Sequence, residues 1–170
     1  MSFLLRRLYQ NEMERAAIIH RTAFADRFPW LAAIHTPDED RDYFRDHVFA
    51  DYEVWGAIDV EMIGFVAFCN GWVDQLYVLP DRQRQGAGHA LLEVAKAASF
   101  SLSLWTLQRN VSARRFYEMH GFVMLKETDG LSNDEHEPDV LYRWQRAAAD
   151  LPALPEPSVC LLSAGRTPRS

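Results

Sequence analysis

The sequence predicts a mixed α/β fold in which about four helices flank one mostly antiparallel, twisted sheet of about seven strands. Two observations lead to this prediction. Asn70-Gly71 joins two β-rich runs, and this dipeptide favours the tight turn of an antiparallel hairpin. The run at 72–79 is followed by Gly86, Gly88 and a helical apolar stripe, so only this strand–loop–helix unit requires a parallel crossover.

The first half of the chain predicts one strand, two helices and three meander strands. Residues 3–8 form the first strand, and residues 12–24 form a helix with Asn11 as its expected N-cap. A second helix over 37–49 begins with Pro37 and three acidic residues, which suit a positive helix end. The meander strands that follow are predicted at residues 52–58, 62–69 and 72–79.

The second half predicts a helix after Gly86, a strand, a helix and two strands. The strands are predicted at residues 102–107, 122–127 and 139–145, with a polar loop over 128–138. Asn110 suits the N-cap of the helix at 111–120, and Gly121 suits the position after its end. Residues 1–146 are expected to form one domain. Residues 147–170, rich in Pro, Ala and Ser, are expected to form a flexible tail.

Composition argues against several classes of partner. The net charge of −6 at pH 7 does not suit a nucleic-acid-binding protein, which needs a basic face. No apolar run approaches the length of a membrane span, and Arg6 and Arg7 interrupt the apolar stretch that a signal peptide would need. We therefore expect a cytoplasmic protein without nucleic-acid or membrane partners. His20, His89 and His120 do not form a credible metal set, so no metal site is expected.

The glycine loop favours a phosphate ligand, because a loop that opens a helix presents unpaired N–H groups and a positive dipole end. The familiar nucleotide motifs fit poorly. A Walker loop needs Gly-Lys-Ser/Thr, whereas Gly88 is followed by His89 and Ala90. A dinucleotide fingerprint needs a third small residue where Leu91 stands. The loop therefore predicts a phosphate-bearing ligand of another kind.

Two motifs in order identify a resemblance. The first is Gln83-Arg84-Gln85-Gly86-Ala87-Gly88 after a strand, and the second is Asn110-x-x-Ala113-x-x-Phe116-Tyr117-x-x-x-Gly121-Phe122. Together they resemble the GNAT family of acetyl-CoA-dependent N-acetyltransferases, and the resemblance spans residues 3–145. It implies the GNAT fold, acetyl-CoA as donor without a metal, and direct transfer of the acetyl group to a primary amine of a small molecule or peptide. A homodimer is one assembly that we consider.

The resemblance also implies roles for individual residues. Backbone groups of Leu76 and Val78 would bind the pantetheine arm and the thioester carbonyl, and an N–H there would stabilise the oxyanion. Tyr117 would protonate the departing thiolate. The residues implied to bind the cofactor are Leu76, Tyr77, Val78, Gln83, Arg84, Gln85, Gly86, Ala87, Gly88, His89, Asn110 and Tyr117.

The general base is left with several candidates. Asp74 is the first, because its apolar neighbours along the strand would raise the pKa of its carboxyl group. Glu135, Glu137 or a water chain are alternatives. The strand at 102–107 carries no carboxylate, where some relatives carry a glutamate. This difference leaves open a non-catalytic acetyl-CoA sensor, and transfer of another acyl group is also open. The acceptor itself is not specified by the sequence, although residues 28–49 and 128–138 are expected to shape its pocket.

Overall fold

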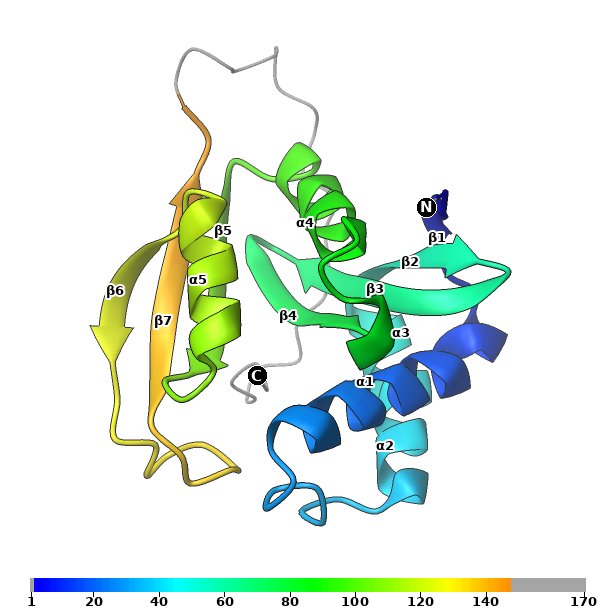
Figure 1. The fold of residues 1–170 in the computed structure, drawn as a ribbon, viewed down its shortest axis with the longest axis horizontal. Helices are drawn as coiled ribbons and strands as arrows, with labels where there is room; N and C mark the ends of the chain where they lie inside the picture. Colours follow the sequence, from blue (N-terminus) through cyan, green and yellow to red (C-terminus); the bar gives the residue numbers. More distant parts are fainter. Residues whose placement is uncertain (1, 148–170) are drawn as a thin grey trace.

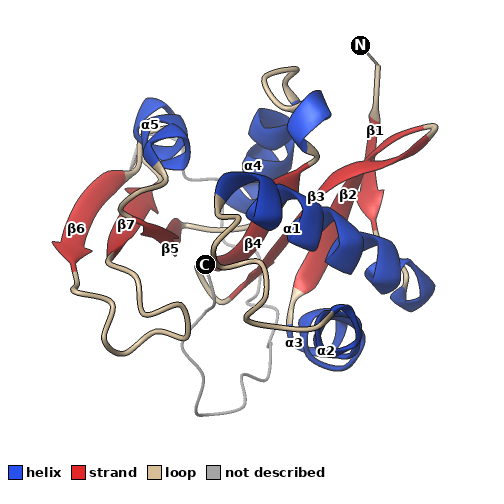
Figure 2. Ribbon diagram, turned by 60° about the horizontal axis from the view of Figure 1, so that its bottom comes forward, coloured by secondary structure: helices blue, strands red, loops and turns tan. Residues whose placement is uncertain are grey.

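The computed structural model describes residues 2–147, so the tail expected to be flexible lies outside the described residues from 148 onward. The described strands form a single seven-stranded sheet in the order β1-β2-β3-β4-β5-β7-β6. They are β1 (Leu4–Arg7), β2 (Glu53–Asp59), β3 (Glu61–Cys69), β4 (Trp72–Val78), β5 (Ser101–Leu107), β6 (Val123–Glu127) and β7 (Asp139–Gln145). In Figure 2, β5, β7 and β6 stand on one side of the molecule and β1, β2 and β3 on the other.

Helices cover both faces of this sheet. They are α1 (Met13–Arg27), α2 (Pro37–Tyr43), α3 (Phe49–Asp51), α4 (Ala87–Ala97) and α5 (Val111–Met119). A π-helical turn (Phe44–Val48) makes α2 and α3 one continuous segment, so four helical segments of the described chain flank the sheet. The predicted mixed α/β class and mostly antiparallel sheet are thereby confirmed.

The sheet separates two hydrophobic cores. One core contains Leu91 and Leu92 of α4 and Tyr117 of α5, and the other contains Met13 of α1 and Phe44. β3 serves both cores because every residue from 62 to 69 is buried. Within the described part of the chain, no helix has the length and apolar character needed to cross a membrane.

Turn chemistry explains where several elements end. Asn70 and Gly71 join β3 to β4 with φ values of 50° and 78°, the left-handed pair that the Asn-Gly dipeptide favours. Gly121 has φ of 81° directly after the end of α5, as expected of a helix C-terminus. These local signals of the sequence therefore predicted real turns.

Two boundary predictions were wrong. Asn11 does not cap α1, because a 3₁₀ turn (Gln10–Glu12) precedes the helix; Glu12 accepts hydrogen bonds from Tyr9 N (2.9 Å) and Arg6 (2.7 Å). The second helix does not run uniformly to residue 49. It takes the π-helical turn and continues to Asp51, and Thr36 caps its start by accepting a hydrogen bond from Glu39 N.

The parallel contact between β4 and β5 is very short. The two strands pair only at Trp72 and Ser103, beside a hydrogen bond from Ser103 N to Gly71 O (2.7 Å). Beyond this point they diverge, with α4 and α5 beside the opening (Figure 1). The sheet is therefore split in its middle, on the side where the glycine loop leads into α4.

Candidate active site

A cleft of about 670 Å³ lies where β4 and β5 diverge. The C-terminal half of α1, β4, the glycine loop, β5 and α5 contribute its walls. Most residues predicted to form the site line this cleft: Asp74, Leu76, Tyr77, Val78, Gln83, Arg84, Gly86, Gly88, His89, Asn110 and Tyr117. Two do not line it. Ala87, the first residue of α4, is buried in the core, and the Gln85 side chain donates to the Asp81 carbonyl (3.1 Å).

The backbone of β4 presents polar groups toward the opening. Leu79 N donates to Ile63 O (2.9 Å), and hydrogen-bonding groups alternate sides along a strand. The backbone N–H and C=O groups of Tyr77, which pairs with Phe65, therefore point toward β3. The N–H and C=O groups of Leu76 and Val78 point the other way, toward the side that β5 has left. Gln83 Nε2 donates to the Val78 carbonyl (3.0 Å), which fixes the start of the glycine loop.

The glycine loop is shaped by backbone conformation more than by packing. Arg84 and Gly86 both adopt left-handed φ values, 59° and 91°, and Gly86 is the N-cap of α4. A Cβ at Gly86 would meet no atom within 4 Å, so the glycine borders open space in the cleft. A Cβ at Gly88 would lie 3.7 Å from the Phe116 ring, an ordinary contact. Arg82 is ion-paired with Asp59 (2.8 Å), which leaves Arg84 as the loop arginine that lines the cleft.

Helix α5 supplies two of the predicted side chains. The Asn110 Oδ1 atom accepts a hydrogen bond from Ala113 N (3.2 Å), so this residue caps α5 and also lines the cleft. Tyr117 is 9% exposed and its ring packs beside Phe122 and Tyr142. Burial raises the pKa of Tyr117 well above its usual value, which keeps the hydroxyl protonated at neutral pH. The side chain can therefore donate a proton.

Asp74 occupies a β-bulge. The register pairs Gln75 with Ala67 and Val73 with Phe68, which leaves Asp74 as the extra residue of β4. Its side chain is 5% exposed, lines the cleft and accepts a hydrogen bond from Gln75 Nε2 (3.0 Å). Burial, together with the nearby Asp74 carboxylate, raises the pKa of the Tyr52 hydroxyl. The bulge thus places a buried carboxylate at the point where the sheet opens.

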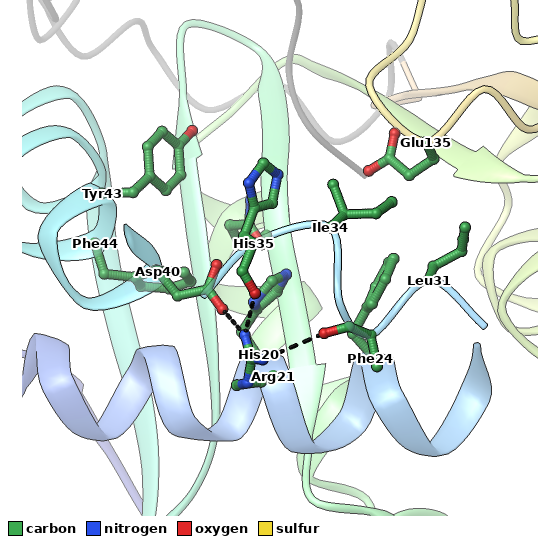
Figure 3. A pocket seen from close by; sticks show the side chains of 12 residues that line it. His20, Arg21, Phe24, Leu31, Ile34, His35, Asp40, Tyr43, Phe44 and Glu135 are labelled. Carbon is green, nitrogen blue, oxygen red and sulfur yellow. Dashed lines mark hydrogen bonds and ion pairs between the residues drawn. The ribbon is translucent and has the colours of Figure 1, made fainter. Parts of the chain in front are cut away.

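A smaller chamber of about 50 Å³ adjoins the cleft. Phe24 lines both the cleft and the chamber. Of two successive residues in β4, Asp74 lines the cleft and Gln75 lines the chamber. Figure 3 shows the chamber between α1, the 31–35 segment and α2, with Glu135 on the opposite side. Its full lining is His20, Arg21, Phe24, Leu31, Ala32, Ile34, His35, Asp40, Tyr43, Phe44, Gln75 and Glu135. Most of this lining comes from residues 28–49 and from Glu135, the two segments in which the acceptor's pocket was expected.

Arg21 holds the walls of the chamber together. Its guanidinium donates to Asp40 Oδ2 (2.7 Å), to the His35 carbonyl (2.8 Å) and to the Ala32 carbonyl (3.2 Å), as the dashed lines in Figure 3 show. Asp40 is 8% exposed, whereas the Arg21 side chain is 32% exposed, so the carboxylate is the shielded partner of this ion pair. A buried carboxylate needs such a partner.

The two other candidate bases, Glu135 and Glu137, lie in different surroundings. Glu135 lines the chamber, whereas Glu137 accepts from Trp30 Nε1 (3.1 Å) and pairs with Arg109 (3.2 Å) outside both hollows. Residues 2–147 contain no cluster of three His, Cys, Asp or Glu side chains arranged to hold a metal ion. Of the rival bases, Asp74 and Glu135 are thus the two that border the hollows.

Several lining residues were not predicted. Arg27 comes from the end of α1, Trp105 and Thr106 come from β5, and Met119 comes from α5. They face the cleft because the sheet splits there, and no local motif marks that split. Burial along β5 does not alternate, so no period-two signal in the sequence marks Thr106.

Comparisons with known proteins agree with this geometry. Residues 48–124 match the model of the acetyltransferase (GNAT) domain. The chain is 33% identical over 79 residues to the uncharacterized N-acetyltransferase YafP of Escherichia coli (strain K12). That match covers 46% of this chain, and the chain spans about half (51%) of the length of this curated relative.

Solved structures share the fold at low identity. The apo form of YjaB from Escherichia coli superposes with a TM-score of 0.70 and 22% identity, covering 84% of this chain and 97% of that one. The PaiA N-acetyltransferase of Thermoplasma acidophilum, solved in complex with coenzyme A, gives a TM-score of 0.63 and 19% identity, covering 86% of this chain and 100% of that one.

Proposed function

This chain belongs to the GNAT acetyltransferase family, and from that premise we propose that it transfers the acetyl group of acetyl-CoA to a primary amine. The observation that carries the proposal is the cleft, because a buried carboxylate, a protonated tyrosine and a glycine loop at the N-terminus of α4 all border it. These groups correspond to the three needs of the reaction: a base, an acid and a donor site.

Two parts of acetyl-CoA, the pyrophosphate and the pantetheine arm, each match a different set of backbone groups in the cleft. The N–H groups at the start of α4 suit a pyrophosphate, because a helix N-terminus favours anions without requiring many basic side chains. The backbone groups of Leu76 and Val78 suit the amides of a pantetheine arm, which would lie along β4 like a neighbouring strand. Such binding is compatible with a net charge of −6.

The proposed reaction uses two side chains. Asp74 accepts a proton from the incoming ammonium group, either directly or through a water molecule. The neutral amine then attacks the thioester carbonyl, and the oxyanion that forms is stabilised by an N–H of β4. As the C–S bond breaks, Tyr117 gives its proton to the departing thiolate, and the second proton lost by the nitrogen as the amide forms returns through water to the Tyr117 oxygen. The products are the N-acetylated amine and coenzyme A.

The chamber is the proposed entry for the acceptor. About 50 Å³ of space accommodates roughly three or four water-sized groups, so it suits the amine-bearing end of a molecule and not a whole bulky substrate. The Glu135 carboxylate favours a cationic end there, and the Arg21 guanidinium is already paired with Asp40.

Asp74→Asn tests the proposal directly. We expect kcat/KM to fall by about a hundredfold, because the base is lost while the side-chain volume is kept. Thiol release from acetyl-CoA with a panel of primary amines is the measurement, and Asp26→Asn, an exposed site on α1, is the control. Acetyl-CoA binding without turnover on every amine would instead favour a sensor. Faster turnover of a longer acyl-CoA would reassign the acyl group.

A further inference from the structure

Two histidines connect the start of α4 to the end of α5. His89 stands in the first turn of α4 and lines the cleft, and His120 ends α5. Nδ1 of His89 lies 2.9 Å from Nε2 of His120, and Nδ1 of His120 lies 2.7 Å from the Phe116 carbonyl oxygen. These are the distances of two hydrogen bonds in series.

The chemistry of the partners places the protons. A carbonyl oxygen can only accept, so Nδ1 of His120 carries hydrogen. When the pair is neutral, Nε2 of His120 is bare and accepts the hydrogen on Nδ1 of His89. The neutral pair therefore has its last nitrogen, Nε2 of His89, without hydrogen.

One added proton changes only that last nitrogen. The hydrogen between the rings can sit on either histidine, but in both arrangements Nε2 of His89 then carries hydrogen. A second added proton would place two N–H groups face to face across 2.9 Å. While the contact is kept, the pair can thus hold one positive charge, and it presents that charge as an N–H of His89.

Three other charged side chains lie near the pair or in the same cleft. On α4, Lys96 donates to the His120 carbonyl (2.9 Å) and is paired with Glu93 (3.0 Å). From the glycine loop, Arg84 lines the same cleft. Lysine, arginine and glutamate side chains ordinarily do not titrate between pH 5 and 8, whereas imidazole does.

We propose that the singly protonated His89–His120 pair is a phosphate contact for the donor, so that coenzyme A thioesters bind more tightly as the pH falls from 8 to 6. The proposal rests on the proposed function, because it takes the cleft as the donor site. His89 contributes the contact, and His120 is the positioning residue that turns the free nitrogen of His89 outward. The contact supplements the backbone N–H groups of the loop.

Calorimetric titration with acetyl-3′-dephospho-CoA tests this proposal. This ligand keeps the pyrophosphate but lacks the terminal phosphate, whose own ionisation near pH 6 would oppose the effect. For the unmodified protein we expect about threefold tighter binding at pH 6 than at pH 8, as for a partly exposed ion pair. His89→Gln should bind more weakly at pH 6 and show no such change. His47→Gln, which replaces an exposed histidine outside the cleft, should keep the threefold difference between pH 6 and pH 8.

A second measurement does not depend on a variant. Because linkage is reciprocal, the bound ligand should raise the pH midpoint of the His89 imidazole signal in NMR spectra. An unchanged midpoint, or an equal pH dependence in His89→Gln, would overturn the proposal and leave the proposed function standing. If the unmodified protein bound no acetyl-CoA at either pH, the proposed function would fail as well.

Discussion

The cleft and the chamber, which we propose take the donor and the acceptor, meet at β4 but are built from different parts of the chain. The cleft relies on backbone groups of β4 and of the loop before α4, which lie within residues 72–89. The chamber relies on side chains from α1, the 31–35 segment, α2 and residue Glu135. A site made from backbone depends on a few glycines and strand ends, whereas a site made from side chains can change with each substitution. We therefore expect donor and acceptor binding to respond separately to mutation.

The largest expected effect concerns the donor cleft alone. Gly86→Glu should weaken acetyl-CoA binding by about a thousandfold, because it places a carboxylate beside the pyrophosphate and puts a side chain at φ of 91°. Calorimetry provides the measurement. Val60→Glu is the matched control and should bind normally, since Val60 is fully exposed, also has a left-handed φ (58°) and does not line the cleft. Normal binding by Gly86→Glu would contradict the loop's assignment.

A second variant separates chemistry from donor binding. Tyr117→Phe should lower kcat by about a hundredfold, because the thiolate would leave without an acid, while the Kd for acetyl-CoA stays nearly unchanged. Tyr142→Phe is a buried control whose hydroxyl donates to Glu118 (2.6 Å) outside the cleft, and it should reduce stability more than kcat. An equal loss of kcat and affinity in Tyr117→Phe would argue against the acid role.

The acceptor chamber can be disturbed through Arg21. Arg21→Gln should raise the KM for the amine by about tenfold and leave the KM for acetyl-CoA unchanged, because Asp40 and two loop carbonyls lose their donor. It should also lower the free energy of unfolding by about 1–3 kcal/mol. Steady-state kinetics with each substrate varied, and urea denaturation, measure these effects. A parallel rise in both KM values would show that binding in the cleft and binding in the chamber are not independent.

The last expected effect concerns neither binding nor turnover but a loss of stability at alkaline pH. Burial raises the pKa values of Tyr52, Tyr77 and Tyr117 above the ordinary 10.0. Above pH 10 the unfolded chain loses these protons first, so the free energy of unfolding falls as the pH rises. The fall is up to about 1.4 kcal/mol per pH unit for each of Tyr77 and Tyr117, and smaller for the half-buried Tyr52, whose shift solvent screens. Urea denaturation from pH 9 to 11 measures this slope, and Tyr117→Phe should make it shallower. An identical slope would mean that Tyr117 is not shielded.

Much of the backbone conformation around the cleft was predictable from the sequence, because turn residues encode backbone conformation. Asn70-Gly71, Gly86 and Gly121 all adopt the left-handed φ that their residue types favour, and Asn110 caps α5 as expected. The direction of the Asp74 side chain was not predictable, because a bulge in β4 sets it and the bulge has no distinct sequence mark.

The chamber was harder to predict for a different reason. Arg21 and Asp40 meet across 19 positions of sequence, and Glu135 comes from the far end of the chain. Local periodicity gives helices and strands but does not say which loops will face one another. The π-helical turn at Phe44–Val48 was missed similarly, since its residues suit an ordinary helix. Each miss thus concerns long-range packing or an irregularity without a local signature.

The single pair between Trp72 and Ser103 has a consequence for how the sheet avoids aggregation. Where β5 leaves β4, the sheet has an additional pair of edges in its interior, and an uncovered edge is ordinarily a site for unwanted pairing with another chain. Here α1, α4 and α5 recess the exposed edge of β4 within the cleft. A thin, linear molecule with amide groups can thus complete the sheet like a missing strand, while a folded neighbour is held at the rim.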